Sequence, residues 1–270
     1  MDLFTHLIIS DTITRITVPG SVYVYLVCGT QRAALIDTGC GVAGLRDYVA
    51  SLTDLPLTVV LTHGHFDHAG GVGEFEEAFL SPQDMELAAR QNSDAVRGRM
   101  LGTLPGIAPE CLVPPAPKKG FLALSEGDRF DLGGEELVIH ALPGHTRGSV
   151  CVEFVEGKKL LLGDACCSAT HLDFPESASV EEYLLSVRSF REKLGAHQGA
   201  CLYSHVHNFG DSRILAEMEQ LCGDILDGKP GCALGGGVYM AKPVDEKRRR
   251  LDGKIANLIY RSDHIRKEHN

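Results

Sequence analysis

Short apolar runs in the first ninety residues have the length and the β-branched composition of strands. Between them lie segments with apolar residues at helical spacing, which begin or end near serine, glycine or proline. The elements predicted here are, in order, strands at residues 12–18, 22–28 and 33–37, a helix at 41–52, a strand at 57–61, and helices at 73–77 and 82–91.

Prolines interrupt this pattern in the middle of the chain. Residues 92–120 carry five of them, so this stretch is predicted to be a loop or lid segment with one short helix. The elements predicted after it are strands at 136–142, 149–155, 159–162 and 200–203, helices at 180–194 and 212–226, and closing strands at 236–241 and 254–261, within residues 236–262.

Strands and helices are mixed along the whole length, without an internal repeat or a low-complexity block. This order indicates a single domain over residues 1–270, of the α/β or α+β class, in which helices cover mixed β-sheets.

Composition narrows the class of protein. The chain has 270 residues, 44% of them hydrophobic, but no apolar run approaches the ~18 residues of a membrane-spanning helix. Residues 1–10 are not typical of a signal peptide. The net charge of −10 is unfavourable for binding a phosphate backbone, so we expect a small-molecule partner and neither nucleic acid nor membrane.

Nine cysteines are spread at irregular intervals, and none forms a C-x-x-C pair. An odd number without an export signal indicates reduced thiols that pack as small apolar side chains. A cytoplasmic location is therefore the default expectation.

Basic residues are concentrated near the end of the chain. Residues 241–270 have a local charge of +4, mainly from the run at 247–250. A solvated turn between the two final strands is favoured over a patch for an anionic partner.

One segment stands apart from the rest, the sequence Thr-His-Gly-His-Phe-Asp-His at residues 62–68. It places His63, His65, Asp67 and His68 directly after a predicted strand. Imidazole nitrogens suit zinc and similar metals, and a carboxylate adds a hard, anionic oxygen. Because residues two apart in an extended segment point the same way, His63 and His65 can share one ion. Asp67 and His68, on the turn beyond, can reach a second ion.

Four ligands do not complete two sites, and three further candidates each follow a short apolar strand. They are His145 in the turn at 142–149, Asp164 after the run at 160–163, and His205 after the strand at 200–203. Each alone would fit a capped turn or a core position. Their shared placement beside glycine or serine, together with the dense motif, favours a role as metal ligands.

In this order and spacing the chain resembles the metallo-β-lactamase fold superfamily, and among its members the small glyoxalase II-like hydrolases. The resemblance rests on the motifs at His63–His68, Asp37-Thr38-Gly39, Gly144–Ser149, Gly163-Asp164 and the late His205. It implies a four-layer αβ/βα sandwich of two mixed sheets, with a dinuclear metal site at one edge.

The resemblance also implies roles for the individual residues. One ion would lie on His63, His65 and His145, and another on Asp67, His68 and His205, with Asp164 bridging. Asp37 would support the ligand loop without binding metal. The late motif differs from the usual pattern because a second histidine, His207, follows His205. His205 is favoured as the ligand because it comes first after the strand. His207 and the loop residue His171 are then candidate substrate contacts.

These features predict a metal-dependent hydrolase with two divalent ions, zinc favoured and iron or manganese as alternatives. Such ions bring the pKa of water from 15.7 towards ~7 and so supply a nucleophile at neutral pH. Asp67, besides binding metal, could orient the attacking water. The small acyl ester expected as substrate is a thioester or lactone. The alternatives are an iron-dependent oxidoreductase of the same fold, resembling persulfide dioxygenases or diiron proteins, and a phosphodiesterase.

Overall fold

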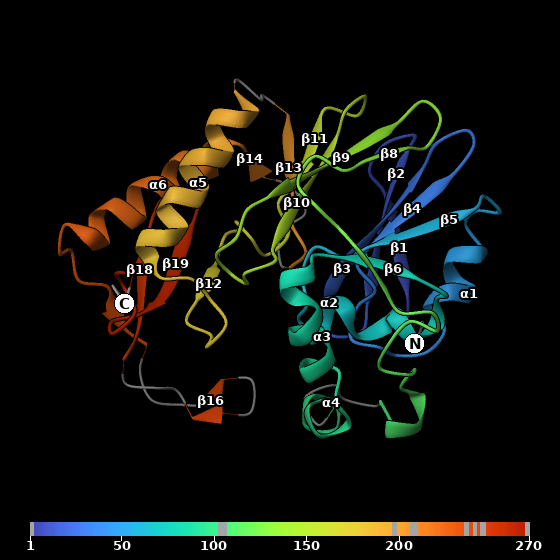
Figure 1. Cartoon of the computed structure of the whole chain (residues 1–270), viewed down its shortest axis with the longest axis horizontal. Coiled ribbons are helices and arrows are strands. Elements are labelled where there is room, and N and C mark those ends of the chain that lie inside the picture. Colours follow the sequence, from blue (N-terminus) through green and yellow to red (C-terminus); the bar gives the residue numbers. More distant parts are fainter. Residues whose placement is uncertain are drawn as a thin grey trace.

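Two large β-sheets form the centre of the molecule (Figure 1). The structure is a computed structural model and describes residues 3–101, 107–195, 199–205, 210–234, 238–239, 242–243 and 247–267. The first sheet follows chain order, antiparallel from β1 to β4 and parallel from β4 to β7. Its strands are β1 (Thr5–Ile8), β2 (Ile13–Val18), β3 (Val22–Cys28), β4 (Ala33–Ile36), β5 (Leu57–Val60), β6 (Ala78–Leu80) and β7 (Phe121–Ala123).

The second sheet has the order β14-β13-β11-β10-β9-β8, with only the β11–β13 pair parallel. Its strands are β8 (Arg129–Asp131), β9 (Glu136–Ala141), β10 (Val150–Phe154), β11 (Lys159–Leu161), β13 (Ala200–Leu202) and β14 (Gly210–Asp211). Smaller sheets were not expected from the sequence. They comprise β12 (Thr170–Leu172), β19 (Asn257–Arg261), β18 (Arg248–Asp252) and β15 (Cys232–Ala233), and the pair β16 (Val238–Tyr239) and β17 (Lys242–Pro243).

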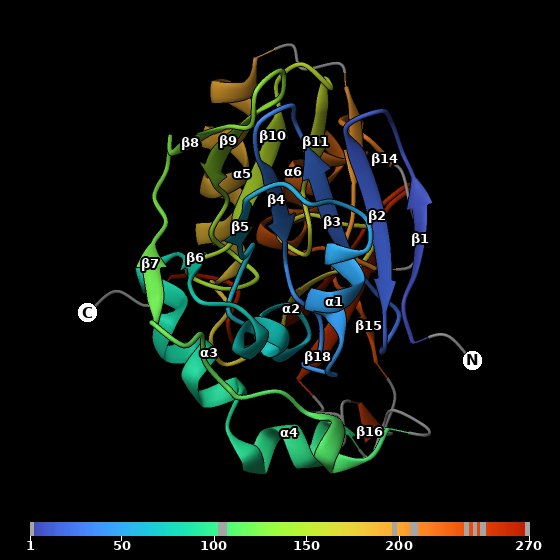
Figure 2. The same cartoon turned by 90° about the vertical axis from the view of Figure 1, so that its right-hand side faces the viewer.

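Helices cover both outer faces of the paired large sheets. Figure 1 shows α5 and α6 beside the second sheet and α1 beyond the first, and Figure 2 shows α1 in front of the first sheet. The α-helices are α1 (Leu45–Ala50), α2 (Phe66–Ala69), α3 (Met85–Gln91), α4 (Asp94–Leu101), α5 (Val180–Leu194) and α6 (Arg213–Leu226). The 3₁₀ helices are η1 (Gly70–Glu74), η2 (Pro82–Asp84) and η3 (Pro109–Cys111).

The alternation of side chains along each strand produces this layering. In β3, Val24 and Leu26 pack towards the helices, whereas Tyr25 and Val27 face the second sheet. Because successive residues of a strand point to opposite faces, a strand buried on both sides is apolar throughout. The four-layer α/β sandwich predicted from the resemblance is confirmed.

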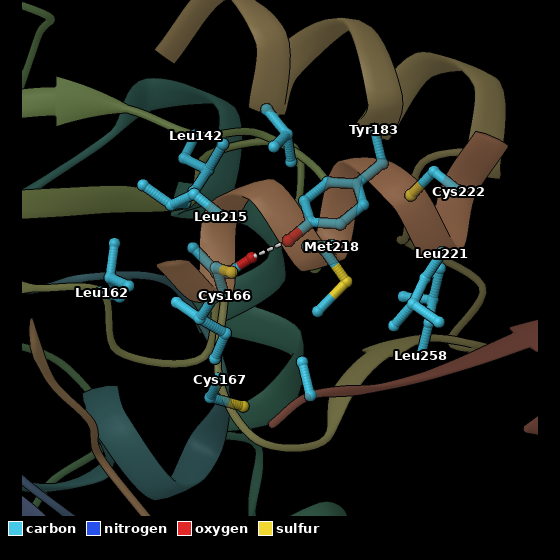
Figure 3. Packing of buried hydrophobic residues seen from close by; sticks show 14 of the residues in the cluster. Leu142, Leu162, Cys166, Cys167, Tyr183, Leu215, Met218, Leu221, Cys222 and Leu258 are labelled. Carbon is cyan, nitrogen blue, oxygen red and sulfur yellow. Dashed lines mark hydrogen bonds between the residues drawn. The ribbon is translucent and has the colours of Figure 1, made fainter. Parts of the chain in front are cut away.

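α5 connects the outer layer with the turns that carry candidate ligands. The helix begins with a capping box in which Ser179 and Glu182 bond each other's backbone N–H. Tyr183, in its first turn, is fully buried and donates its hydroxyl to the carbonyl of Ala165, at 2.6 Å (Figure 3). A Cβ on Gly144 would lie 2.1 Å from the Tyr183 ring. One side chain therefore contacts both the turn before His145 and the turn after Asp164.

Two of the predicted helices are wrong in position. The helix expected at 41–52 is shortened to α1, because Gly41 and Gly44 adopt positive φ angles of 85° and 108°. The helix expected at 73–77 lies earlier, as α2 and η1. Its early start lets Gly71 approach Thr38 so closely that a Cβ would lie 2.2 Å from the Thr38 carbonyl.

The basic run at 247–250 is also not the solvated turn predicted. Residues 248–250 belong to β18, between β15 and β19, and Arg248 is buried against the carboxylate of Asp173. The ion pair compensates for burial of the guanidinium group. The expected strand at 236–241 lies partly outside the described residues.

The segment at 92–120, predicted to be a loop or lid, carries α4 and η3 within its described part, and a lid function stays a prediction. None of the helices that the structure describes is long and apolar enough to cross a membrane.

Candidate metal centre

Four of the predicted ligands lie on the turn that follows β5 and on the short helix after it. His63 precedes His65, whose backbone is extended, with φ −69° and ψ 150°. α2 begins at the next residue and carries Asp67 and His68 in its single turn. The change from extended to helical backbone lets the two pairs of side chains join different ligand groups.

The first group, called here the first trio, consists of His63, His65 and His145. His65 Nδ1 lies 3.1 Å from His63 Nε2 and 2.9 Å from His145 Nε2, and all three residues are buried. His145 comes from the turn between β9 and β10, in the second sheet's half of the molecule. Three ring nitrogens converging on one point match the ligand set of a single ion.

The second trio consists of Asp67, His68 and His205. His205 Nε2 lies 3.3 Å from His68 Nε2 and 3.4 Å from Asp67 Oδ2. Asp164 lies between the two trios, with its Oδ2 atom 3.2 Å from His205 Nε2 and 3.9 Å from His145 Nε2. One carboxylate oxygen therefore reaches a histidine of each trio.

Hydrogen bonds fix which nitrogen faces the centre in four of the five histidine rings. The outer nitrogens are bonded as follows: His63 Nδ1 to Thr62 Oγ1 at 3.1 Å, His65 Nε2 to Glu176 Oε1 at 2.8 Å, His68 Nδ1 to Asp37 Oδ2 at 2.8 Å, and His145 Nδ1 to the His171 carbonyl at 2.8 Å. The hydroxyl, carboxylate and carbonyl oxygens of these partners accept hydrogen bonds from the outer nitrogens. In a neutral ring the inner nitrogen then carries a lone pair, as metal ligation requires.

This donor set fits divalent metal ions. Lone pairs that face one another at about 3 Å cannot hydrogen-bond, whereas one cation between them satisfies all of them. Asp164 Oδ1 is buried and has no hydrogen-bond partner among the described residues. A buried carboxylate oxygen without a partner is rare and is explained when it faces a metal ion. Imidazole with carboxylate oxygen suits zinc, iron and manganese.

The two trios differ in electrostatics. Burial lowers the pKa of His145 to about 3 and holds that of His63 well below its usual value. Burial also lowers the pKa values of His68 and His205, but the attraction of the nearby carboxylates Asp67 and Asp164 is larger. It raises the pKa of His68 to about 10 and that of His205 to about 11. His63 and His145 of the first trio are therefore neutral near pH 7, whereas His68 and His205 of the second trio hold their protons.

The carboxylates of the second trio are held ionised. Burial raises the pKa of Asp164 and of Asp67, but the histidine charges beside them are stronger and bring both pKa values well below the usual range. Asp67 retains access to solvent, with 23% of its side chain exposed. A charged and partly open carboxylate can bind a cation and also contact water.

Asp37 contacts the ligand loop and the back of the His68 ring. Its carboxylate accepts hydrogen bonds from Thr62 N at 2.7 Å and from His68 Nδ1 at 2.8 Å. Its φ angle of 64° is in the left-handed region, which costs energy for a residue other than glycine. The strained backbone places a buried carboxylate behind the ring of His68, away from the metal side.

The remaining predicted residues are placed differently. His207 lies outside the described residues. His171 is on β12, not on the predicted loop, and its ring bonds Asp173 Oδ1 at 2.9 Å and lies against Arg248. Its carbonyl is the group that orients His145, so the described contact with the centre is made by backbone. A substrate contact for His171 stays a prediction.

Sequence reasoning missed three residues at the centre. Glu176 bonds His65, the ring of Phe174 lies 5.2 Å from that of His65, and the buried carboxylate of Asp84 bonds both ligand turns. None belongs to a local motif, because each contacts residues more than ten positions away. Only the fold brings them there.

The model of the metallo-beta-lactamase superfamily matches residues 17–196, two thirds of the sequence. The chain belongs to the metallo-β-lactamase superfamily. Among curated members, the acyl-coenzyme A thioesterase MBLAC2 of Gallus gallus is 32% identical over 209 residues, 71% of this chain and 74% of the relative. The human MBLAC2 is 28% identical over 221 residues, 71% of this chain and 75% of the relative.

Other superfamily members match more distantly. A hydroxyacylglutathione hydrolase of Pseudomonas syringae pv. syringae is 30% identical over 131 residues, 47% of this chain and 40% of the relative. Among solved structures, a metallo-beta-lactamase from Pontibacter korlensis aligns with a TM-score of 0.63 at 20% identity, covering 81% of this chain and 98% of that one. At that identity the likeness shows the fold alone. The family membership and the cluster of candidate metal ligands together identify this protein as a metallo-hydrolase.

Proposed function

We propose that this metallo-hydrolase cleaves acyl thioesters, using two divalent ions held by the two trios and Asp164. The observation that carries the proposal is the convergence of seven donor side chains on one centre, four of them histidines whose outer nitrogens already bond other groups. The thioester is supported by relatives named acyl-coenzyme A thioesterase, which align over 71% of this chain.

The roles of the residues follow from their contacts. The first trio would hold one ion, the second trio the other, and Asp164 would bind both. When bound, such ions lower the pKa of water towards 7 and offset the negative charge that develops on a carbonyl oxygen under attack.

Asp67 is proposed to contribute to catalysis as well as to ligation. Its carboxylate is held ionised and partly exposed, so it can accept a hydrogen bond from the attacking water and orient it. Phe174 supplies an apolar wall beside the first trio, which limits access of bulk water from that side. The substrate would then lie over the open side of the second trio.

Zinc is the proposed metal, because three neutral imidazoles with no thiolate suit it and hydrolysis requires no redox change. The cytoplasmic location stays the prediction from the cysteine pattern. Iron in place of zinc would instead support the oxidoreductase alternative.

A substrate panel tests the proposal. Purified protein is analysed for metal and then assayed against acyl-coenzyme A thioesters, lactones and a phosphodiester at equal concentrations. We expect about two zinc ions per chain and thiol release from the thioesters at least tenfold faster than turnover of the other classes. Preferred cleavage of the phosphodiester, or iron with oxygen consumption on a persulfide, would contradict the proposal.

A further inference from the structure

A buried carboxylate directly before α3 contacts both turns that carry the first trio. Asp84 is the last residue of η2 and directly precedes α3, where an aspartate usually caps the helix through its side chain. Here the side chain makes no such bond. It points instead into the interior, where only 1% of the residue is exposed.

The carboxylate of Asp84 bonds the first turn at Gly64, the residue between His63 and His65. The Gly64 N–H donates to Asp84 Oδ2 at 2.9 Å. A Cβ on Gly64 would lie 2.7 Å from the carbonyl oxygen of Asp84, so backbone packs directly on backbone here. The position of this turn relative to α3 is thus fixed by a hydrogen bond and by close packing.

The same carboxylate bonds the second turn on both sides of Arg147. Thr146, which follows His145, donates its hydroxyl to Asp84 Oδ2 at 2.6 Å, and the Gly148 N–H donates to Asp84 Oδ1 at 2.8 Å. A Cβ on Gly148 would lie 2.6 Å from Asp84 Cγ. One carboxylate therefore accepts from turns that are about eighty residues apart in sequence.

These contacts concern the first trio and not the second. His63, His65 and His145 all lie on the two turns, whereas His68 is oriented by Asp37 and His205 follows β13. Asp84 accepts from three donors at once, and hydrogen bonds to a carboxylate are stronger than those between neutral groups. Asp84 is thus an acceptor that the two turns share.

We propose that Asp84 is a positioning residue, which sets the spacing of the two turns so that the first trio binds a metal ion tightly. The inference rests on the proposed function in so far as that trio holds metal. Its consequence is selective: weakening Asp84 lowers affinity for the ion of the first trio, and leaves the second trio close to its original affinity.

The test is the zinc affinity of Asp84→Asn, measured by competition with a chelator, together with the visible spectrum of the cobalt-substituted protein. Asparagine has the same shape as aspartate, but its amide N–H₂ replaces an oxygen that accepts a hydrogen bond and so faces a donor. We expect the affinity of the first trio to fall by about tenfold or more, the range typical for residues that support metal ligands. Cobalt bands of the three-histidine site should weaken, and the second ion should stay within about threefold.

Glu135 offers a matched control. This residue is also 1% exposed. Its carboxylate accepts hydrogen bonds from the Thr12 hydroxyl and from the backbone N–H groups of Glu156 and Gly157. It precedes β9, at the end of that strand away from His145. Glu135→Gln should therefore lower the free energy of unfolding to an extent comparable with Asp84→Asn, while leaving zinc affinity unchanged. Equal loss of zinc in both variants would overturn the positioning role.

A second pair of variants decides the matter if Asp84→Asn does not fold. Thr146→Val removes one donor to Asp84, and Thr146→Ser keeps it. Weaker zinc binding in the valine variant with rescue by serine supports the proposal. Wild-type affinity in the folded Asp84→Asn or Thr146→Val protein would overturn it and leave the proposed function standing. Wild-type protein that binds no zinc at the first trio would contradict the proposed function itself.

Discussion

At the scale of single residues, the two trios hold their protons differently. His145 and His63 are neutral near pH 7, because burial depresses each pKa. His68 and His205 have pKa values raised to about 10 and about 11 by the carboxylates around them. Since a histidine must lose its ring proton before it binds metal, the two sites should respond to pH in different ways.

We expect zinc binding to the second trio to release about two protons at pH 7 from His68 and His205, and binding to the first trio to release none from His63 and His145. The affinity of the second trio should rise with pH by about tenfold per unit for each proton displaced. Calorimetry of the chelator-stripped protein in buffers of different ionisation enthalpy measures the proton count. Equal release at both steps would contradict the difference between the trios.

Asp164 provides a second test at this scale. It reaches a histidine of each trio, so Asp164→Ala removes the anion between two cations and should cost one ion per chain. The Asp164 side chain is at the edge of the core and its loss creates no apolar cavity, so the fold should persist. Metal content and circular dichroism check both parts. A folded variant that keeps two ions would show that Asp164 does not bridge.

At the scale of elements, α5 holds the ligand turns through Tyr183. Tyr183→Phe leaves the buried carbonyl of Ala165 without its donor, which should lower the free energy of unfolding by about 1–3 kcal/mol. Urea denaturation measures the change. Leu185→Ala on the same helix, at a residue that is 61% exposed, should change it by less than about 0.5 kcal/mol. A neutral Tyr183→Phe would show that the hydrogen bond contributes nothing to stability.

Elements with strong local signals were predicted well from the sequence. The helix at 180–194 matches α5, because Ser179 and Glu182 form a capping box and its apolar residues recur at helical spacing. The strand at 22–28 matches β3, whose residues are apolar on both faces. The start of α1 was misplaced because Gly41 and Gly44 before it adopt positive φ angles, and sequence alone does not show which glycines do so. α2 was missed because it is a single turn of four residues.

At the metal centre, the sequence predicted only those residues that belong to a recognisable motif or follow a strand. His63 to His68 form a dense cluster, and the other candidates share a place after strands. Glu176 and Asp84 escaped notice because an isolated carboxylate on a loop or before a helix has no distinguishing neighbour in sequence. The buried Arg248 was missed for a related reason: its partner Asp173 is 75 residues away.

At the scale of the whole molecule, two half-structures meet at the metal centre. The first sheet's half supplies the turn and helix with His63, His65, Asp67 and His68, and the second half supplies His145, Asp164 and His205. Neither half alone has a complete trio, so bound metal should stabilise their association. Excess zinc should raise the midpoint of thermal unfolding of the chelator-stripped protein, and differential scanning calorimetry measures it. An unchanged midpoint would contradict metal binding between the halves.

The central claim is that metal held by these two trios is what allows the chain to cleave a thioester. The most direct measurement is thiol release from an acyl-coenzyme A by chelator-stripped protein, as zinc is added back in steps. We expect a negligible rate without zinc and a rise that saturates near two equivalents, with no recovery in the His63→Ala/His65→Ala double variant. Thiol release that is independent of zinc, or that persists in the double variant, would contradict it.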